Sequence, residues 1–339
     1  MDKERAHTFL AMVMPDLERV REIFLSLTRS IDSVVERIGG LVRENAGKML
    51  RPALMLLSHR MLDGDGAERR CEAREAPPDP VLRLAAVIEL LHTATLVHDD
   101  VIDEADMRRG SPSLNALCGN EVSVLAGDWC YITALQAAVE LRNFQVLDIL
   151  LDVVRRMVEG ELIQLDFIGR IDITREESLD IASRKTAHLF SSCTRLAGVL
   201  RGRERAEIDA LFRIGFDLGM AFQLMDDVLD FTAAEAKLGK PIMNDLREGK
   251  VTLPVIHLLE GGDPRHRHLV KTVLAEKDFR TVQAEEFRHL LTENGCIART
   301  VSLAETYIHS GKACLGAYPP SPCRDALLGI ADFILTRGY

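Results

Sequence analysis

Aromatic residues are scarce in this sequence, at 5% of its 339 residues. The alternation of Val, Ile and Thr between turn residues, which is typical of β-strands, is also missing. Both shortages argue against a sheet-based fold, because strands favour β-branched and aromatic side chains. Ala, Leu, Glu and Arg are plentiful instead, and these residues favour helices. We therefore predict an all-α protein that forms a single domain over residues 1–339.

Paired cysteines and long apolar runs are missing as well. None of the seven cysteines belongs to a Cys-x-x-Cys pair, which argues against a zinc site and against a disulfide framework. The most apolar stretch, 81–97, is interrupted by Arg83 and Glu89, so it falls short of the roughly 18 apolar residues of a membrane span. The first residues, MDKER, lack the apolar core of a secretion signal. We expect a cytoplasmic protein without a transmembrane segment.

Positive charge is in deficit. The chain has 42 Lys and Arg residues against 52 Asp and Glu residues, which gives a formal net charge of −10 at pH 7. This balance argues against a protein that holds nucleic acid by bulk electrostatic attraction, because phosphate backbones attract basic surfaces. We therefore expect no nucleic-acid partner.

Apolar residues recur at spacings of three and four through most of the chain, which is the helical pattern. It predicts helices over 17–38, 50–62, 80–103, 121–142, 145–168, 175–200, 204–234 and 249–261. Glycines at 39–40, 169 and 261–262 are expected to break them, and Thr174 with Glu177 is typical of a capping box. The segment 63–80, rich in Gly, Pro and charge, is expected to be a mobile inter-helix loop.

Two clusters of aspartates lie on two of the predicted helices. Each reads Asp-Asp-x-x-Asp, over residues 99–103 and 226–230. The first and last carboxylates of a cluster share one helix face, about 5–6 Å apart at Cβ, where unpaired like charges repel. A hard divalent cation such as Mg²⁺ would remove that repulsion, because it prefers oxygen ligands and shares them with phosphate oxygens. One such cluster alone would be read as a solvated helix face.

Basic residues accompany the clusters and extend the argument. Arg108 and Arg109 follow the first cluster, Lys240 and Lys250 follow the second, and a third group opens the helix at 50. Guanidinium and ammonium groups are regular partners of phosphate oxygens. The pattern predicts a Mg²⁺-bridged polyphosphate between two acidic helices, with a second anion on the basic side.

These motifs together resemble those of the trans-isoprenyl diphosphate synthases. The resemblance rests on five segments in family order: ELLHTATLVHDDVIDEADMRRG over 89–110, FQLMDDVLD over 222–230, GKMLRP over 47–52, the pair Lys185-Thr186, and KVTLP over 250–254. They span most of the chain, from about residue 40 to residue 260. Two positions depart from the pattern: Met49 stands where a basic residue is common, and Met243 stands where Gly is common.

The resemblance implies a helical bundle with a central cavity, an isoprenoid synthase-type fold that is usually homodimeric. The implied reaction is the repeated head-to-tail condensation of isopentenyl diphosphate onto an allylic diphosphate, with three Mg²⁺ ions bound together with the substrate diphosphate. Asp99, Asp103 and Asp226 would be the leading metal ligands, supported by Asp100, Asp227 and Asp230. Lys48, Arg51, His92 and Arg109 would bind isopentenyl diphosphate. Arg108, Lys185, Thr186, Gln223 and Lys240 would face the allylic diphosphate, and Lys250 would assist in binding substrate.

The length of the product is expected to depend on residues about one helical turn before Asp99. Ala94 and Thr95 occupy these positions and are small, whereas bulky aromatics close the cavity near here in short-chain relatives. The resemblance then favours a long, octaprenyl-like product built on farnesyl or geranylgeranyl diphosphate. Leu150, Met157 and Trp129 are candidates for the wall or floor, although ordinary core packing explains them as well.

Several alternatives stay open at this point. A shorter product, geranylgeranyl or farnesyl diphosphate, is one, and the catalytic subunit of a two-component synthase is another. A non-catalytic regulatory subunit would be expected to have lost aspartates, whereas this chain keeps all six. His98-Asp99 reads as the HD pair of metal phosphohydrolases, which explains neither the second cluster nor the arginines. A class I terpene cyclase would be expected to lack the GKMLRP element. Transient membrane contact for product release also remains open.

Overall fold

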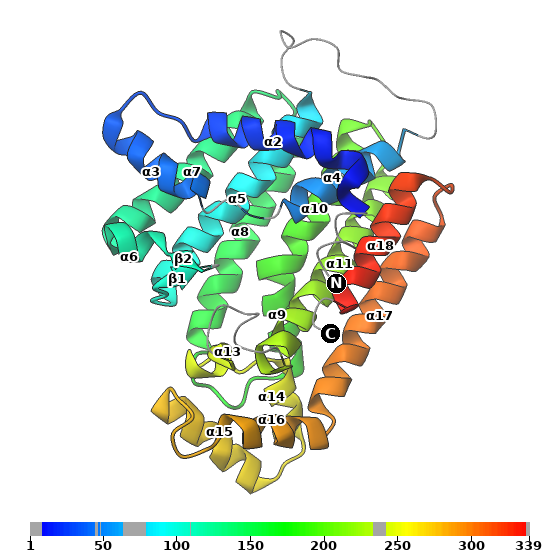
Figure 1. Ribbon diagram of the computed structural model, residues 1–339. Helices are drawn as coiled ribbons and strands as arrows, with labels where there is room; N and C mark the ends of the chain where they lie inside the picture. The colour runs from blue at the N-terminus through cyan, green and yellow to red at the C-terminus, as the bar shows by residue number, and fades with distance from the viewer. Residues whose placement is uncertain are drawn as a thin grey trace. The chain divides into compact units, whose positions relative to one another are not determined.

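The computed structural model describes residues 9–44, 47, 49–63, 79–108, 110–232 and 242–336. Helices make up nearly all of its secondary structure (Figure 1), which confirms the predicted all-α class. The elements are η1 (Ala11–Val13), α2 (Met14–Leu27), α3 (Ser33–Glu44), α4 (Leu50–Met61), α5 (Pro80–Ile102), β1 (Met107–Arg108), β2 (Ser111–Pro112), α6 (Leu114–Cys118), α7 (Asn120–Val139), α8 (Phe144–Asp166), α9 (Arg175–Ala182), η2 (Ser183–Ala187), α10 (His188–Leu200), α11 (Arg205–Thr232), α13 (Asn244–Arg247), α14 (Leu253–Glu260), α15 (Pro264–Glu276), α16 (Ala284–Glu293), α17 (Cys296–Gly316) and α18 (Pro322–Thr336). Most of the predicted loop 63–80 lies outside the described residues.

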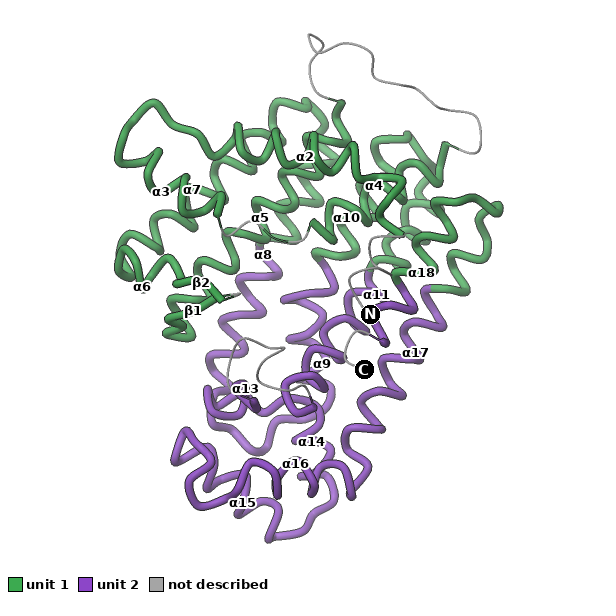
Figure 2. Tube along the Cα trace, viewed as in Figure 1, with its two compact units in different colours: residues 1–154, 189–215, 312–330 green, residues 155–188, 216–311, 331–339 purple. Residues whose placement is uncertain are grey.

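The chain divides into two compact units (Figure 2). Unit 1 contains residues 1–154, 189–215 and 312–330, and unit 2 contains residues 155–188, 216–311 and 331–339. The division falls inside long helices such as α8 and α11, which begin in one unit and end in the other. A single domain with a central cavity stays a prediction.

Unit 1 is organised around α5, which packs on α2, α4 and α7. The buried face of α7 consists of small residues: Ser123, Ala126, Gly127, Cys130, Ala134, Ala137 and Ala138. At Gly127 a Cβ atom would lie only 2.2 Å from Nε2 of His98 on α5. Small side chains therefore let α7 approach α5 closely, and His98 is a residue of that interface, where its Nε2 lies 3.0 Å from the Val124 carbonyl oxygen.

Unit 2 has its own apolar core. The end of α11 and the helices α13 to α16 contribute to it through Phe231, Met243, Leu246, Val255, Ile256, Val270, Val273, Phe287 and Leu291.

The helix α9 begins with the predicted capping box. Thr174 Oγ1 accepts the Glu177 N–H at 3.2 Å, and Glu177 Oε2 accepts the Thr174 N–H at 2.7 Å. This reciprocal pair satisfies two N–H groups that a helix start leaves without partners.

Two helix predictions were wrong in their boundaries. The range 17–38 is two helices, because Thr28 ends α2 and Asp32 caps α3 through its Oδ1, which accepts the Val34 N–H at 2.9 Å. The glycines at 39–40 do not break a helix, since α3 runs through them. A Cβ at Gly39 would lie 2.3 Å from the Thr28 carbonyl oxygen and 3.3 Å from the Trp129 ring. Gly39 thus permits close packing, and Trp129 packs against α3.

Two of the described helices, α5 and α7, have the length and composition of a membrane span. The relevant stretch is 72% buried inside the protein for α5 and 39% buried for α7. The core helix of a protein that never enters a bilayer meets the same criterion.

Two buried cysteines have thiols that resist ionisation. Cys130 and Cys193 lie in the core of unit 1, and burial raises the pKa of each thiol to about 12. Both therefore stay protonated near neutral pH, as expected of core-filling residues.

Candidate active site

The first aspartate cluster lies at the C-terminal end of α5. Asp103 is the C-cap residue, and its N–H donates to the Asp99 carbonyl at 2.8 Å. Asp99 and Asp103 are partly exposed, whereas Asp100 is 4% exposed. Carboxylates at this end of a helix oppose the helix dipole, because the dipole favours cations there. The position itself therefore favours a bound cation.

A short hairpin brings Arg108 to the first cluster. Strands β1 and β2 pair with Arg108 opposite Ser111, and Ser113 ties the hairpin to the end of α5 through a 2.5 Å bond from its Oγ to the Ala105 carbonyl. Arg108 donates from Nε to Oδ1 of Asp100 at 2.6 Å. Arg108, predicted to face the allylic diphosphate, is thus paired with a carboxylate of its own cluster. Arg109 lies outside the described residues.

The basic element at the start of α4 is represented by Arg51. Its guanidinium carbon lies 4.9 Å from the centre of the Phe190 ring on α10, within the range of a cation–π contact. Met49 caps the helix in a left-handed conformation, with φ of 56°, and is buried. His92 lies two turns before Asp99 on α5 and is partly buried. Lys48 lies outside the described residues.

The two predicted chain-length residues lie one turn before Asp99. Ala94 is fully buried, and Thr95 is partly buried. The Thr95 hydroxyl donates to the His92 carbonyl of its own helix at 2.7 Å. That internal bond satisfies the hydroxyl, so Thr95 can border an apolar chain without the penalty of an unsatisfied polar group.

The second aspartate cluster lies near the end of α11 in unit 2. Asp226 is partly exposed, while Asp227 and Asp230 are buried. Burial raises the pKa of Asp227 well above its usual value, and the carboxylate of Asp245 raises it further. Gln223 lowers that pKa through a 2.9 Å bond from its Nε2 to Asp227 Oδ1. Such crowding of carboxylates favours a divalent cation.

Thr186 and Gln223, both predicted to face the allylic diphosphate, form one chain with Asp227. The Thr186 hydroxyl donates to Oε1 of Gln223 at 2.6 Å, and the amide nitrogen of Gln223 donates to Asp227. The first bond orients the Gln223 amide so that its donor faces the carboxylate. These two residues thus fix the direction of an acidic side chain.

Lys185 lies in a π-helical turn, η2, that separates α9 from α10. Its Nζ donates to Oε1 of Gln164 on α8 at 2.9 Å and pairs with the Glu161 carboxylate. At Gly160 a Cβ would lie 3.0 Å from Cγ of Lys185, so glycine lets η2 approach α8. Sequence reasoning missed Gly160, Glu161 and Gln164. The one available signal was a glycine inside a strongly helical pattern.

Lys250 follows the short helix α13. Its backbone N–H donates to the Asp245 carbonyl at 2.8 Å, and its Nζ donates to Oε2 of Glu248 at 2.7 Å. The side chain is largely buried. Lys240 lies outside the described residues.

No set of three His, Cys, Asp or Glu residues converges as a ready-made metal site within the described parts of the chain. Mg²⁺ usually takes one or two protein carboxylates and completes its shell with waters and substrate phosphates. Asp99 and Asp103 in unit 1 and Asp226 in unit 2 are partly exposed carboxylates of that kind.

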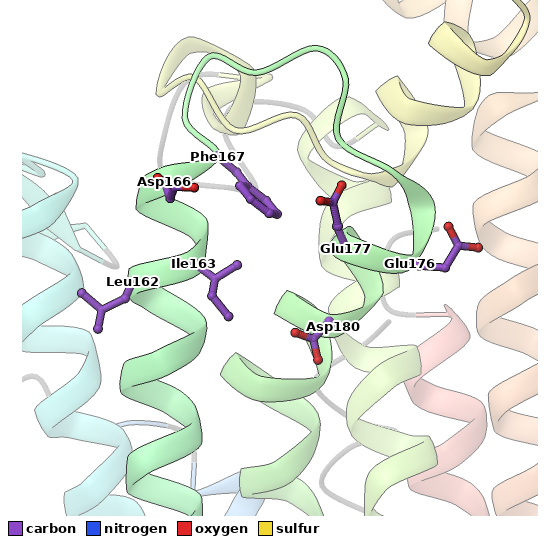
Figure 3. Close-up of a pocket in the computed structure, with 7 residues that line it drawn as sticks. All are labelled: Leu162, Ile163, Asp166, Phe167, Glu176, Glu177 and Asp180. Atoms are coloured by element: carbon purple, nitrogen blue, oxygen red, sulfur yellow. The ribbon is translucent and has the colours of Figure 1, made fainter.

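A hollow of about 680 Å³ lies between the end of α8 and α9 in unit 2. Its lining residues are Leu162, Ile163, Asp166, Phe167, Glu176, Glu177 and Asp180. In Figure 3, Ile163 on α8 and Phe167, which follows the end of α8, point toward α9. None of the predicted site residues that the structure describes lines this hollow.

Comparison with known proteins bears directly on these motifs. The family model described as polyprenyl synthetase matches residues 33–291. The octaprenyl diphosphate synthase of Escherichia coli is 34% identical over 95% of this chain and 96% of its own. A short chain isoprenyl diphosphate synthase of Methanothermobacter thermautotrophicus is 32% identical over 95% of each.

Two solved structures are similar along almost their whole length. The polyprenyl synthase of Caulobacter crescentus, complexed with calcium and isoprenyl diphosphate, has a TM-score of 0.89 and 30% identity, covering 98% of each chain. The decaprenyl diphosphate synthase of Rhodobacter capsulatus has a TM-score of 0.87 and 32% identity, covering 98% of this chain and 99% of its own. Because the matched range contains both aspartate clusters and the basic elements predicted with them, this chain belongs to the polyprenyl synthetase family and is a trans-isoprenyl diphosphate synthase, a prenyltransferase.

Proposed function

We propose that this enzyme makes a long all-trans polyprenyl diphosphate of octaprenyl-like size from isopentenyl diphosphate and a farnesyl or geranylgeranyl primer. The observation that carries the length is the pair Ala94 and Thr95. Both are small, and the only polar group between them is satisfied within its own helix. A growing apolar chain would therefore meet neither bulk nor an unpaired hydroxyl one turn beyond Asp99. The octaprenyl and decaprenyl synthases among the similar proteins support a long product.

The residues divide the chemistry among them. Asp99, Asp103 and Asp226 would hold Mg²⁺, in three ions per site, and the metal would neutralise charge on the departing diphosphate. Arg51 and His92 would bind isopentenyl diphosphate, and Lys185 and Lys250 would bind the allylic diphosphate. Apolar walls would keep water from the allylic cation after the C–O bond breaks. We name no protein base, because the released diphosphate can take the proton.

The direct test uses the purified chain with Mg²⁺, farnesyl diphosphate and labelled isopentenyl diphosphate. Extracted products should form a ladder that ends near octaprenyl diphosphate. A ladder that stops at geranylgeranyl diphosphate would reject the long-chain assignment in favour of a short-chain synthase. If the lone chain makes no product, the two-component alternative replaces the homomeric one, because a separate subunit would then be required.

Product length has a matched pair of variants on α5. Thr95→Phe places a ring one turn before Asp99 and is expected to end the ladder several units earlier. Thr95→Val keeps the size of threonine and removes only the hydroxyl, so the ladder should end where the native one does. An unchanged ladder in Thr95→Phe would mean that the chain grows along another path.

We also propose that the enzyme works as a homodimer. Two helices carry exposed apolar residues at intervals of seven, namely Leu125, Ile132 and Val139 on α7, and Leu151, Val158 and Leu165 on α8. Leu125 and Ile132 are 68% and 65% exposed. Such a row on a helix face is typical of a surface that packs against another helix. A second copy of this chain would cover it.

Sedimentation should show a dimer for the native chain and a monomer for Ile132→Lys. The exposed residue Glu121 on the same helix offers a control, since Glu121→Lys adds a positive charge outside the apolar row and should leave the dimer intact. A native monomer at micromolar concentration would refute the dimer.

A cytoplasmic location and transient membrane contact for product release stay proposals.

A further inference from the structure

Asp230, the last aspartate of the second cluster, accepts hydrogen bonds from the backbone of a turn. Its side chain is 2% exposed. Oδ1 accepts the backbone N–H of Asn244 at 3.1 Å, and Oδ2 accepts the backbone N–H of Asp245 at 3.2 Å. Its own carbonyl accepts the N–H of Met243 at 2.8 Å. Three consecutive N–H groups of one turn thus donate to a single residue on α11.

The turn needs these acceptors. Asn244 and Asp245 are the first residues of α13, and the first N–H groups of a helix have no partner within it. A Ser, Thr, Asp or Asn at the N-cap would supply an oxygen, but the N-cap here is Met243, whose side chain has none to offer. Asp230 performs this capping from a different helix, α11. It lies 14 residues before Asn244 in the chain.

The same turn fixes Lys250. The N–H of Lys250 donates to the Asp245 carbonyl at 2.8 Å, and the N–H of Gly249 donates to the Leu246 carbonyl at 3.1 Å. Lys250 Nζ then donates to Glu248, whose backbone N–H is bound by the Asn244 carbonyl at 2.9 Å. Hydrogen bonds therefore connect Asp230 to the backbone of Lys250, and Glu248 from the same turn holds the Lys250 ammonium.

We propose that Asp230 is a positioning residue, which holds the turn 243–250 and thereby places Lys250 against the allylic diphosphate, while Asp226 serves the metal. The part that concerns the diphosphate rests on the proposed function. The capping itself does not, because it involves only contacts within the folded chain.

The structural arm of the test measures hydrogen exchange in peptides covering 242–252. In Asp230→Ala, the Asn244, Asp245 and Lys250 amides should exchange at least tenfold faster than in the native chain, because their anchor is gone. Asp230→Asn keeps one acceptor and should give an intermediate rate. Asp226→Asn, the matched control on the same helix, should leave these rates unchanged. Unchanged exchange in Asp230→Ala would overturn the proposal, even if the enzyme had no activity.

The kinetic arm separates positioning from metal binding. Asp230→Asn should raise KM for the allylic diphosphate at least fivefold and leave the Mg²⁺ concentration for half-maximal activity within twofold of native. Asp226→Asn should instead raise that Mg²⁺ concentration at least tenfold. A similar Mg²⁺ shift in both variants would show that Asp230 is a metal ligand and would overturn the proposal. If the native chain makes no product, the exchange arm still decides the capping.

Discussion

Replacing Met243 by Gly should destabilise the protein, although Gly is the residue that the backbone conformation favours. Met243 has φ of 55° and ψ of 38°, in the left-handed region. A non-glycine residue there costs about 1–2 kcal/mol, which Gly would recover. However, Met243 is fully buried in the core of unit 2, and truncating a buried Met costs about 2–5 kcal/mol. Burial outweighs strain, so we expect a net loss of about 2 kcal/mol.

A second substitution separates the two contributions. Met243→Ala loses the same packing but keeps the left-handed strain, so it should be less stable than Met243→Gly by about 1 kcal/mol. Lys277 supplies the opposite case, because it has φ of 49° and an exposed side chain. Lys277→Gly removes strain without losing burial and should stabilise the protein by up to about 1 kcal/mol.

Urea unfolding followed by circular dichroism measures all three variants against the native chain. The expected order of stability is Lys277→Gly, native, Met243→Gly, Met243→Ala. A Met243→Gly protein as stable as the native one would show that the methionine side chain contributes little. The reasoning would then fail, and the departure from the family pattern at this position would have no energetic explanation in packing.

Three further results are expected. Asp99→Ala should lower kcat/KM at least a hundredfold. Its melting temperature should stay within a few degrees of the native value, because Asp99 is partly exposed. A collapsed melting transition would indicate a structural role instead. Burial, with Arg201 beside it, lowers the pKa of His59 from 6.5 to about 4, so the unfolded chain takes up this proton first as the pH falls. This difference in pKa should lower the free energy of unfolding by about 3 kcal/mol between pH 7 and pH 4. The drop should be smaller in His59→Gln, and urea titrations at both pH values measure it. Gly160→Val should cut kcat/KM at least tenfold without loss of helical circular dichroism, because a Cβ there would lie 2.8 Å from Cβ of Arg184 and displace η2.

The helical class and the two clusters were predictable because their signals are local. Apolar residues fill most of α5, which is buried nearly all round from Val81 to Ala94, and the spacing of Asp99 and Asp103 places both on one helix face. The capping box at Thr174 is equally local, and the structure contains both of its hydrogen bonds. Each of these features depends on residues within about one turn of each other.

The rest depends on contacts between segments distant in sequence, which spacing does not encode. The bond from Arg108 to Asp100 exists because a hairpin folds back on α5. A glycine stands inside α3 at position 39 because Thr28 and Trp129 leave no room for a larger residue. Asp230 caps a turn in which Asn244 lies 14 residues later in the chain. The contacts of Lys185 with Glu161 and Gln164 on α8 likewise join segments that are distant in sequence.

The π-helical turn η2 also affects how α9 continues into α10. The N–H of His188 donates to the Ser183 carbonyl, five residues back, so the segment accommodates one more residue per turn than an α-helix would. Deleting one residue within 183–187 would let the backbone continue as an ordinary α-helix. Because an α-helical turn holds that one residue fewer, the helices on either side would keep nearly the phase that they have now. A one-residue gap in a homologue should therefore be tolerated better within 183–187 than inside the α-helical parts of α9 or α10.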